Sequence, residues 1–329
     1  MHVSELQTPA LVVDLPAFQR NVDHMATMHP GPALRPHVKA FKSTALARRL
    51  VEAGHPGFCC ATVREVLGMA AAGLGGDLLL ANETLDPQRL RAMAELDEPV
   101  TVAVDSDATV DAAAAAGIRR VLIDVEVGLP RCGCQVDDAG RLADRARAAG
   151  MEVRGVMGYE GHVNVLHDPR ERRVAVEAAM QQLLEAHEQV GGDVISGGGT
   201  MTAELNECVT ELQAGTYVLM DTAFEAHVPF EIAIGVEATV ISVNPRGWAV
   251  ADAGLKAFGM DHGEPALPDA SVWIVSDEHL SFAGLDVAVG DRVRLLPAHL
   301  DPTVAKHERM WVLDGDEVVD EWPVDLRGW

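Results

Sequence analysis

A lysine-containing stretch near the N-terminus has residue types that could do chemistry. Residues 34–43 read LRPHVKAFKS, which predicts a short buried strand that ends near Lys39 and a helix capped by Ser43. An amine held where a strand hands over to a helix can lose its solvation and attack carbonyl groups as a Schiff-base nucleophile. The alternative, which this stretch alone favours, is that Lys39 or Lys42 is a solvated loop lysine.

Two glycine-rich turns have the composition of anion-binding loops. Residues 196–200 read SGGGT and lie between a predicted strand and a predicted helix over Met201–Cys208, where backbone amides and the helix N-terminus could approach a phosphate. Residues 213–217 read QAGTY and place another glycine and hydroxyl after the next strand. One such turn would only close a tight connection, but two in the final loops of a barrel form a common phosphate cup.

Three further side chains follow predicted strands, where the mouth of a barrel would lie. Arg131 follows the strand over 120–127, and because arginine keeps its proton it would donate a hydrogen bond to a pyridine nitrogen. Tyr159 and His162 follow the strand over 153–158 and add an aromatic ring and an acid/base candidate. Considered separately, Arg131 could equally be a surface arginine in a turn. His162 could equally be a structural or solvated histidine.

His299 and Asp301 are the clearest candidates for a binding site in the last third of the chain. They lie two residues apart at the end of an apolar strand, so both side chains are expected on one face. An imidazole and a carboxylate without a nearby thiol suit a divalent ion that keeps several waters, such as Mn²⁺, Mg²⁺ or Zn²⁺. Taken alone, a His-x-Asp pair at a strand end is more often part of a polar rim than a metal site.

The elements that must position these residues alternate between apolar strands and alanine-rich helices. Eight such strands in succession predict a (β/α)8 TIM-like barrel, an α/β fold whose strands are buried on both faces. The predicted strands cover residues 34–38, 57–61, 78–82, 100–105, 120–127, 153–158, 193–196 and 212–220.

After about residue 225 the helical periodicity disappears and strand-like segments separated by turns take over. We therefore expect three parts: an N-terminal strand and lead-in over 1–20 that packs with the β domain, a barrel over 21–225, and a C-terminal β-rich domain over 226–329 that carries the metal site. The predicted strands of this domain cover 232–243, 248–252, 272–276, 292–297, 310–313 and 317–322, with a hairpin turn at 314–316.

Composition excludes several classes of partner. Fifty acidic against 26 basic residues give a formal charge of −24, which would repel nucleic acid and anionic membranes. No signal peptide or membrane-length apolar segment is visible. The five cysteines show neither a disulfide framework nor a metal-ligand spacing, which indicates a reducing cytoplasm. A small molecule is therefore the expected partner.

Together these stretches resemble the D-threonine aldolase/D-serine dehydratase-like family of fold-type III, alanine racemase-like, pyridoxal-phosphate enzymes. The resemblance extends over nearly the whole chain. The matching segments are, in order, 8–14 (TPALVVD), 35–39 (RPHVK), 59–61 (CCA), 80–83 (LANE), 196–200, 213–217, 252–257 (DAGLKA) and 299–303 (HLDPT).

The resemblance implies a pyridoxal 5′-phosphate (PLP) cofactor, a divalent metal and a homodimer in which the β domain of one subunit closes the barrel mouth of the other. It implies that Lys39 binds PLP as a Schiff base and that Arg131 faces the pyridine nitrogen. His37 and Tyr159 are further cofactor-binding candidates. The residues implied to hold the phosphate are Gly199, Thr200, Gly215 and Thr216, and those implied to bind the metal are His299 and Asp301.

Two departures from the family pattern matter. Members commonly have histidine two residues after the lysine, where this chain has Phe41, so the role of that histidine is absent or is taken by His37 or His162. Dehydratase members typically carry His-x-Cys as the metal motif. The carboxylate of Asp301 makes a harder site that suits Mn²⁺ or Mg²⁺, with Zn²⁺ as an alternative, and favours the aldolase branch.

The resulting prediction is a lyase that cleaves D-β-hydroxy-α-amino acids such as D-threonine to glycine and an aldehyde. The metal would lower the pKa of the β-hydroxyl, and His162 or a metal-bound water would take its proton. The first alternative is a dehydratase acting on D-serine or D-threo-3-hydroxyaspartate, with a 2-oxo acid and ammonia as products. A second is a PLP-binding homeostasis protein without robust turnover, against which the β domain and its His299/Asp301 pair argue.

Overall fold

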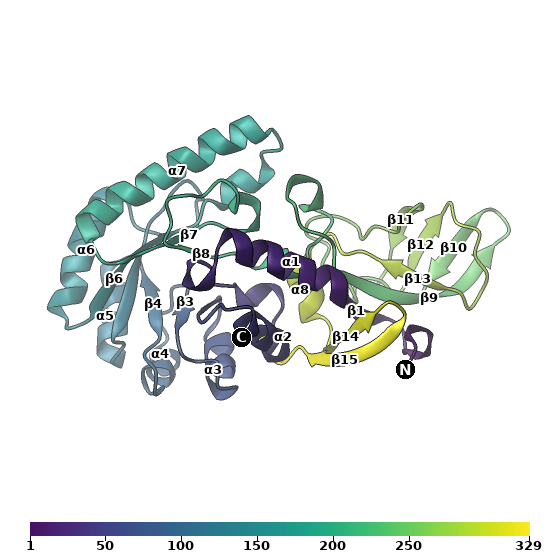
Figure 1. Ribbon diagram of the computed structural model, residues 1–329, viewed down its shortest axis with the longest axis horizontal. Helices are drawn as coiled ribbons and strands as arrows, with labels where there is room; N and C mark the ends of the chain where they lie inside the picture. The colour runs from purple at the N-terminus through teal and green to yellow at the C-terminus, as the bar shows by residue number, and fades with distance from the viewer. The chain divides into compact units, whose positions relative to one another are not determined.

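Seven short parallel strands form the sheet on which the cofactor-site candidates lie (Figure 1). The computed structural model describes residues 1–329, and these strands are hydrogen-bonded in chain order. They are β2 (Phe58–Cys60), β3 (Leu78–Leu80), β4 (Thr101–Val104), β5 (Arg120–Asp124), β6 (Glu152–Gly158), β7 (Val194–Gly197) and β8 (Glu211–Leu212). The alternating helices are α2 (Thr44–Glu52), α3 (Val63–Ala71), α4 (Pro87–Ala94), α5 (Asp107–Ala116), α6 (Val136–Ala148) and α7 (Pro169–Val190).

The interior of this sheet is a packed core. One residue from each of six successive strands joins a single buried cluster, so side chains fill the space against this sheet. These residues are Cys59, Leu79, Ala103, Leu122, Met157 and Val194. The predicted βα alternation and the α/β class are confirmed.

The chain divides into two compact units, which we call the barrel unit and the β unit. The barrel unit consists of Met25–Lys39 and Ala47–Gly215, together with Trp329. The β unit consists of Met1–His24, Ala40–Leu46 and Thr216–Gly328. The two main stretches of the barrel unit are therefore inserted into the chain of the β unit. The chain crosses between the units after His24, Lys39, Leu46 and Gly215, and once more before Trp329.

The eighth strand of the barrel is replaced by a bridging segment over residues 34–37. Leu34 makes a parallel bridge with Leu212 of β8, and His37 makes one with Cys59 of β2. Backbone hydrogen bonds of 2.9 Å from Arg35 N–H to the Leu212 carbonyl and from His37 N–H to the Ala214 carbonyl join the segment to the last strand. The predicted strand over 34–38 thus occupies its expected place, but with isolated bridges in place of a regular ladder.

Arg35 ties this bridging segment to the strands beside it. Its Nη2 donates to Asp77 Oδ2 at 2.6 Å and to Glu211 Oε2 at 2.8 Å, and its Nη1 donates to the Asp77 carbonyl at 3.1 Å. The Arg35 side chain is 4% exposed and that of Glu211 is 8% exposed. The Glu211 carboxylate also accepts a 2.7 Å hydrogen bond from the Ser196 hydroxyl. A buried cation therefore holds the first and last parts of the barrel together.

The Arg35→Met variant is expected to be strongly destabilised. Removing one partner of a buried ion pair leaves the other charge uncompensated, which typically costs about 3–5 kcal/mol of the free energy of unfolding. Urea unfolding followed by circular dichroism measures this loss. The matched control is Arg145→Met, which removes an exposed ion pair with Asp111 and should leave the midpoint nearly unchanged. Equal midpoints for the wild type and the Arg35 variant would contradict the role of this ion pair.

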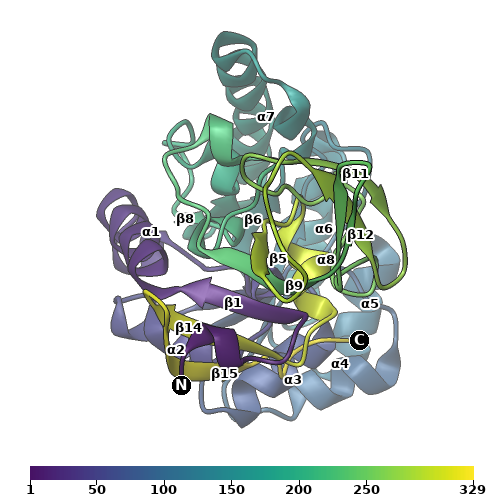
Figure 2. The same ribbon diagram turned by 90° about the vertical axis from the view of Figure 1, so that its right-hand side faces the viewer.

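The β unit is built on a sheet whose central strand comes from the N-terminus (Figure 2). Strand β1 (Ala10–Asp14) pairs antiparallel with β9 (Ile234–Asn244) and parallel with β14 (Arg309–Asp314). The sheet order is β11-β12-β10-β9-β1-β14-β15, and β13 also pairs with β9. The remaining strands are β10 (Trp248–Ala251), β11 (Ser271–Val275), β12 (Leu280–Ala283), β13 (Arg292–Leu295) and β15 (Glu317–Pro323).

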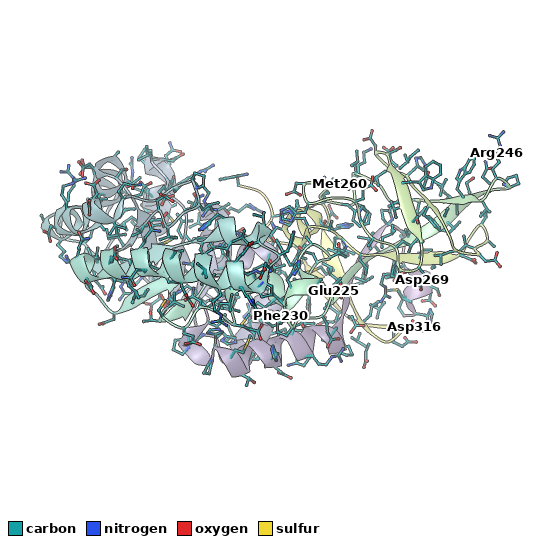
Figure 3. All side chains as sticks on the ribbon, turned by 90° about the horizontal axis from the view of Figure 1, so that it is seen from above. Glu225, Phe230, Arg246, Met260, Asp269 and Asp316 are labelled. Atoms are coloured by element: carbon teal, nitrogen blue, oxygen red, sulfur yellow. The ribbon has the colours of Figure 1, made fainter.

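Most of these strands match the predicted segments to within a few residues, but β12 was not predicted. The predicted hairpin turn over 314–316 joins β14 to β15, and Figure 3 shows Asp316 there and Arg246 at the tip of the β9–β10 hairpin. Outside the strands, the β unit contains the helix α8 (Leu300–Ala305) and most of α1 (Leu15–Met28). Across the whole chain, no helix combines the length and the apolar character needed to cross a membrane.

Candidate active site

The cofactor-site candidates of the barrel unit gather around the ring of Tyr159. Lys39 Nζ lies 5.9 Å from the centroid of this ring, and the guanidinium carbon of Arg131 lies 5.5 Å from it. Asn164 Nδ2 donates a 3.1 Å hydrogen bond to the Tyr159 hydroxyl, which orients the ring. Gly199 borders the same ring, because a Cβ added there would lie 3.4 Å from Tyr159 Cε2. The structure thus brings four predicted residues together at the carboxyl edge of the barrel strands.

Lys39 lies in a 3-10 turn, η3 (Val38–Ala40), and not at the end of a regular strand. The predicted strand register is therefore corrected, because the bridging segment already ends at His37. The helix that follows begins as expected, since Ser43 Oγ accepts the Leu46 N–H at 3.3 Å and caps α2.

Lys42, the other candidate for the nucleophilic lysine, lies in a different environment from Lys39. Its Nζ donates a 2.7 Å hydrogen bond to the backbone carbonyl of Asp301 within the β unit. Lys42 therefore supports the predicted metal-binding turn, whereas Lys39 presents its amine to Tyr159. Of the two, Lys39 is the nucleophile candidate.

Side-chain hydrogen bonds shape the glycine-rich turn after β7. Gly198 N–H donates to Glu160 Oε2 at 3.2 Å, and Asn206 Nδ2 donates to Glu160 Oε1 at 3.3 Å. Gly199 N–H donates to Thr202 Oγ1 at 3.0 Å. Because both glycine amides have protein acceptors, these glycines set the path of the turn. Burial raises the pKa of Glu160, and the donors around it oppose that rise.

The helix predicted over Met201–Cys208 is wrong. A 3-10 turn, η5 (Thr200–Thr202), stands in its place. The Thr202 hydroxyl accepts the Gly199 N–H of the turn, and the Asn206 amide donates to Glu160, which also accepts the Gly198 N–H. Thr200 is buried at the start of η5. In the second glycine-rich turn, Gly215 ends the long Ala47–Gly215 stretch of the barrel unit and Thr216 begins η6 (Thr216–Val218).

The two histidine candidates of the barrel unit differ in position. His37 is buried and belongs to the bridging segment. His162 lies in η4 (Gly161–Val165), where its ring covers Gly128 and its Nδ1 is buried without a hydrogen-bond partner. Gly128 has φ +123°, and a Cβ there would overlap the imidazole, so the close approach requires glycine.

His299 and Asp301 are brought together in the β unit, although not by a strand. His299 is the N-cap residue of α8 and Asp301 lies in the first turn of that helix, so the expected strand alternation is wrong. The helix begins here because the buried Asp221 accepts the Leu300 N–H at 2.9 Å. His299 Nε2 nevertheless lies 4.0 Å from Asp301 Oδ2.

Two residues that the sequence reasoning did not single out complete this cluster. Asp261 Oδ2 lies 2.7 Å from His299 Nδ1, which makes Nε2 the candidate metal-binding nitrogen. The ring of His262 stacks on that of His299 with centroids 3.8 Å apart and an interplanar angle of 6°. Both residues precede His299 by more than 35 positions, in a loop without a motif spacing, so only the fold reveals them.

A glycine lets this loop reach His299. Gly259 bridges His299, and its N–H donates to Thr303 Oγ1 at 3.0 Å. A Cβ at Gly259 would overlap the ring of Pro302, so a larger residue would push the loop away. The segment that carries Asp261 therefore depends on this close backbone contact.

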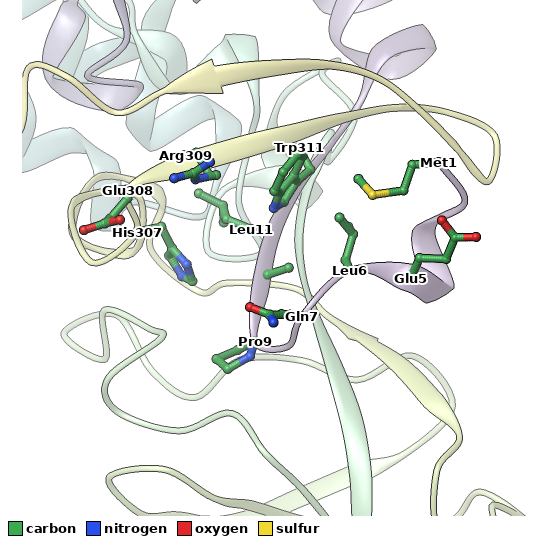
Figure 4. Close-up of a pocket in the computed structure, with 11 residues that line it drawn as sticks. Met1, Glu5, Leu6, Gln7, Pro9, Leu11, His307, Glu308, Arg309 and Trp311 are labelled. Carbon is green, nitrogen blue, oxygen red and sulfur yellow. The ribbon is translucent and has the colours of Figure 1, made fainter.

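The hollow in Figure 4 is separate from these residues. It has a volume of about 510 Å³ and none of the predicted site residues lines it. Its walls come from the N-terminal segment and from the start of β14, including Leu6, Pro9, His307 and Trp311. This hollow is therefore not part of the candidate active site.

Comparisons with known proteins agree with this arrangement. The family model for the alanine racemase N-terminal domain matches residues 13–223, and that for a putative serine dehydratase domain matches residues 233–313. A D-threonine aldolase from Arthrobacter sp. is 33% identical over 99% of this chain and 94% of its own length. The chain belongs to the D-threonine aldolase/D-serine dehydratase-like family.

Other family members support this assignment. A 3-hydroxy-D-aspartate aldolase from Paracoccus denitrificans (strain Pd 1222) is 31% identical over 100% of this chain and 94% of its own length. The crystal structure of D-threonine aldolase from Filomicrobium marinum superposes with a TM-score of 0.91, at 31% identity, over 98% of this chain and 96% of that one. The resemblance read from the sequence is confirmed, and the chain is a lyase.

Membership in this family implies PLP, and the residues present fit that group. An amine and a guanidinium, Lys39 and Arg131, flank one aromatic ring, and Gly199 leaves the adjoining space without a side chain. A metal ion also fits the β unit. His299 offers one nitrogen whose tautomer Asp261 fixes, and Asp301 offers a carboxylate oxygen.

Proposed function

We propose that this enzyme uses PLP and a divalent metal to cleave D-β-hydroxy-α-amino acids, with D-threonine as the model substrate, to glycine and an aldehyde. One observation carries the proposal. His299 faces the carboxylate of Asp301 in a β unit that contains no cysteine, in a chain 33% identical to an Arthrobacter D-threonine aldolase. Oxygen and nitrogen ligands without a thiol suit Mn²⁺ or Mg²⁺, with Zn²⁺ as the alternative.

PLP, when bound, supplies the electron sink for the pair of electrons released as the Cα–Cβ bond breaks. Lys39 provides the amine that holds the cofactor, and Tyr159 positions that amine through its ring. Arg131 can only donate a hydrogen bond, so a pyridine nitrogen facing it would remain unprotonated. The turns with Gly199, Thr200, Gly215 and Thr216 would hold the phosphate, and His37, in the bridging segment just before Lys39, is a further cofactor-binding candidate.

His162 is the proposed base that takes the proton of the β-hydroxyl group. Its Nδ1 is buried, so Nε2 is the atom that exchanges the proton. The His162→Asn variant should keep its cofactor and lose about 10²–10⁴-fold in kcat, which is the usual contribution of a general base. Steady-state kinetics with D-threonine measure the loss. The matched variant Gly128→Ala, which displaces the ring without removing it, should lower kcat in the same direction, and a wild-type kcat in both would contradict the role of His162.

The assembly and the compartment belong to the same proposal. We place the enzyme in a reducing cytoplasm, which its five free cysteines support, as a homodimer that acts on a small amino acid. Sedimentation velocity of the purified protein tests the dimer.

The dehydratase reaction is the second candidate. A D-threo-3-hydroxyaspartate dehydratase from Delftia sp. (strain HT23) is 30% identical over 98% of this chain and 98% of its own length. The deciding experiment incubates the holoenzyme with D-threonine, L-threonine, D-serine and D-threo-3-hydroxyaspartate, with and without EDTA. Aldehyde and glycine from D-threonine support the proposal, whereas a 2-oxo acid and ammonia as the products would overturn it.

A further inference from the structure

Asp221 is a buried acid that reaches the backbone between the two candidate metal ligands. It is 0% exposed, and its Oδ2 accepts the N–H of Leu300, the residue between His299 and Asp301, at 2.9 Å. The other oxygen, Oδ1, is buried without a hydrogen-bond partner. Burying a carboxylate oxygen without a partner costs free energy, so a gain in stability does not account for this acid.

Asp221 and the residue after it hold the backbone on both sides of His299. The Thr222 N–H donates to the carbonyl of Pro297, two residues before His299, at 3.1 Å. The Asp221 carboxylate takes the N–H one residue after His299. Two adjacent residues therefore fix the path of the chain that presents this imidazole.

Two residues with a strained backbone adjoin these contacts. Only three non-glycine residues of the chain have a positive φ, and they include Lys42 at +50° and Met220 at +56°. Lys42 donates to the Asp301 carbonyl, and Met220 immediately precedes Asp221. Backbone strain of this kind persists only where the surrounding structure fixes it, and it collects at functional sites. The strain therefore marks the contacts to this turn as functional.

Asp221 also follows a short buried segment that begins at Thr216. The four residues between them are fully buried, and the Met220 N–H donates to the Thr216 carbonyl at 2.7 Å. The Leu219 carbonyl accepts the Ala233 N–H at 2.7 Å, which fixes the middle of the segment. Both ends belong to the β unit. Because a packed interior does not deform freely, a shift at Thr216 displaces Asp221 as well.

We propose that Asp221 is a positioning residue for the metal site, and that the segment from Thr216 to Asp221 couples this site to the phosphate of PLP. The inference rests on the proposed function, in which His299 and Asp301 bind the metal and Thr216 helps to hold the phosphate. A phosphate that fixes Thr216 also fixes the carboxylate that holds the metal-binding turn. Coupling between two sites is reciprocal, so each group favours binding of the other.

The first experiment titrates Mn²⁺ into the full-length protein without PLP and follows binding by calorimetry. Asp221→Ala removes the acceptor and should weaken Mn²⁺ binding by about 10–100-fold, the usual effect of losing a residue that orients a metal ligand. Asp221→Asn keeps a carbonyl oxygen for the Leu300 N–H and should restore most of that loss. Wild-type affinity in Asp221→Ala, or an equal loss in both variants, would overturn the positioning role.

Glu237→Gln is the matched control, because Glu237 is another buried acid of the β unit and pairs with Arg294. This variant should bind Mn²⁺ like the wild type even if its thermal unfolding midpoint falls. A loss of Mn²⁺ affinity equal to that of Asp221→Ala would mean that binding follows general stability, which would overturn the proposal.

The second experiment compares the Mn²⁺ affinity of the wild type with and without bound PLP, and it decides the coupling even if Asp221→Ala does not fold. Coupled sites typically change each other's affinity by about 5–150-fold, so the PLP-loaded protein should bind Mn²⁺ at least about fivefold more tightly. Asp221→Asn should keep this difference and Asp221→Ala should lose it. Equal wild-type affinities, or a difference that Asp221→Ala retains, would overturn the coupling.

These outcomes separate the inference from the proposed function. Wild-type protein that binds no Mn²⁺, or no PLP, would refute the proposed function itself. Wild-type protein that binds both, with the same Mn²⁺ affinity in Asp221→Ala, would refute only the role of Asp221.

Discussion

The Lys39→Ala variant is expected to lose the visible absorbance of bound PLP and about 10³-fold or more of the aldolase activity. The reason is that the variant lacks the amine next to Tyr159, which is the proposed covalent nucleophile. Spectra of protein incubated with PLP and dialysed measure the first loss, and an aldehyde assay with D-threonine measures the second. Thermal unfolding should remain near that of the wild type, because the substitution leaves the buried cluster inside the barrel intact.

The matched control is Lys42→Ala, three residues further along the chain. Lys42 Nζ bonds to the Asp301 carbonyl, so this variant should keep the PLP absorbance and show weaker metal binding. The opposite pattern, with the absorbance lost from the Lys42 variant and kept in the Lys39 variant, would mean that the two lysines have been assigned the wrong way round.

Replacing Asp301 by alanine is expected to remove most of the metal-dependent activity and leave PLP bound. Asp301 is the proposed charged oxygen ligand of the metal, whereas the lysine and the arginine that flank Tyr159 belong to the barrel unit. Calorimetric titration of the metal-free protein with Mn²⁺, paired with an absorbance spectrum of the same sample, separates the two effects. Wild-type metal content in this variant, or full activity of metal-free wild-type protein, would contradict a metal-assisted mechanism.

Replacing Asp261 should weaken metal binding less than replacing Asp301 does. It holds His299 from the far side of the imidazole, and residues in that position typically contribute about 10–100-fold to metal affinity. Asp261→Ala should therefore weaken Mn²⁺ binding by about that factor, less than Asp301→Ala does. Asp316→Ala, an exposed acid in the β14–β15 turn (Figure 3), is the control and should bind Mn²⁺ like the wild type.

The parts of the fold that follow a simple period were predicted from the sequence. Strands buried on both faces read as continuous apolar runs, so β2 to β7 were placed correctly, and the β unit was recognised where helical periodicity ends. Lys39, Arg131 and Tyr159 were correctly expected at one edge, because parallel strands end on the same side of a sheet.

The errors occurred where long-range hydrogen bonds override local preference. The segment after Thr200 has the composition of a helix, but Glu160, which lies about 40 residues earlier, holds Gly198 and Asn206 in a turn. Asp221 starts α8 from almost 80 residues away, which the strand reading of His299 and Asp301 could not include.

Because the barrel unit is inserted into the chain of the β unit, the barrel strands are synthesised before the β unit is complete. The barrel has all its strands once residue 215 has left the ribosome. Strand β1 is made first but needs β9 and β14 on its two sides, so its backbone stays incompletely paired until residue 314 emerges. A nascent or truncated chain that ends between these points presents a free apolar strand, LVVD over residues 11–14, to other chains. Premature termination in the last third of the message should therefore yield aggregates, whatever the state of the barrel.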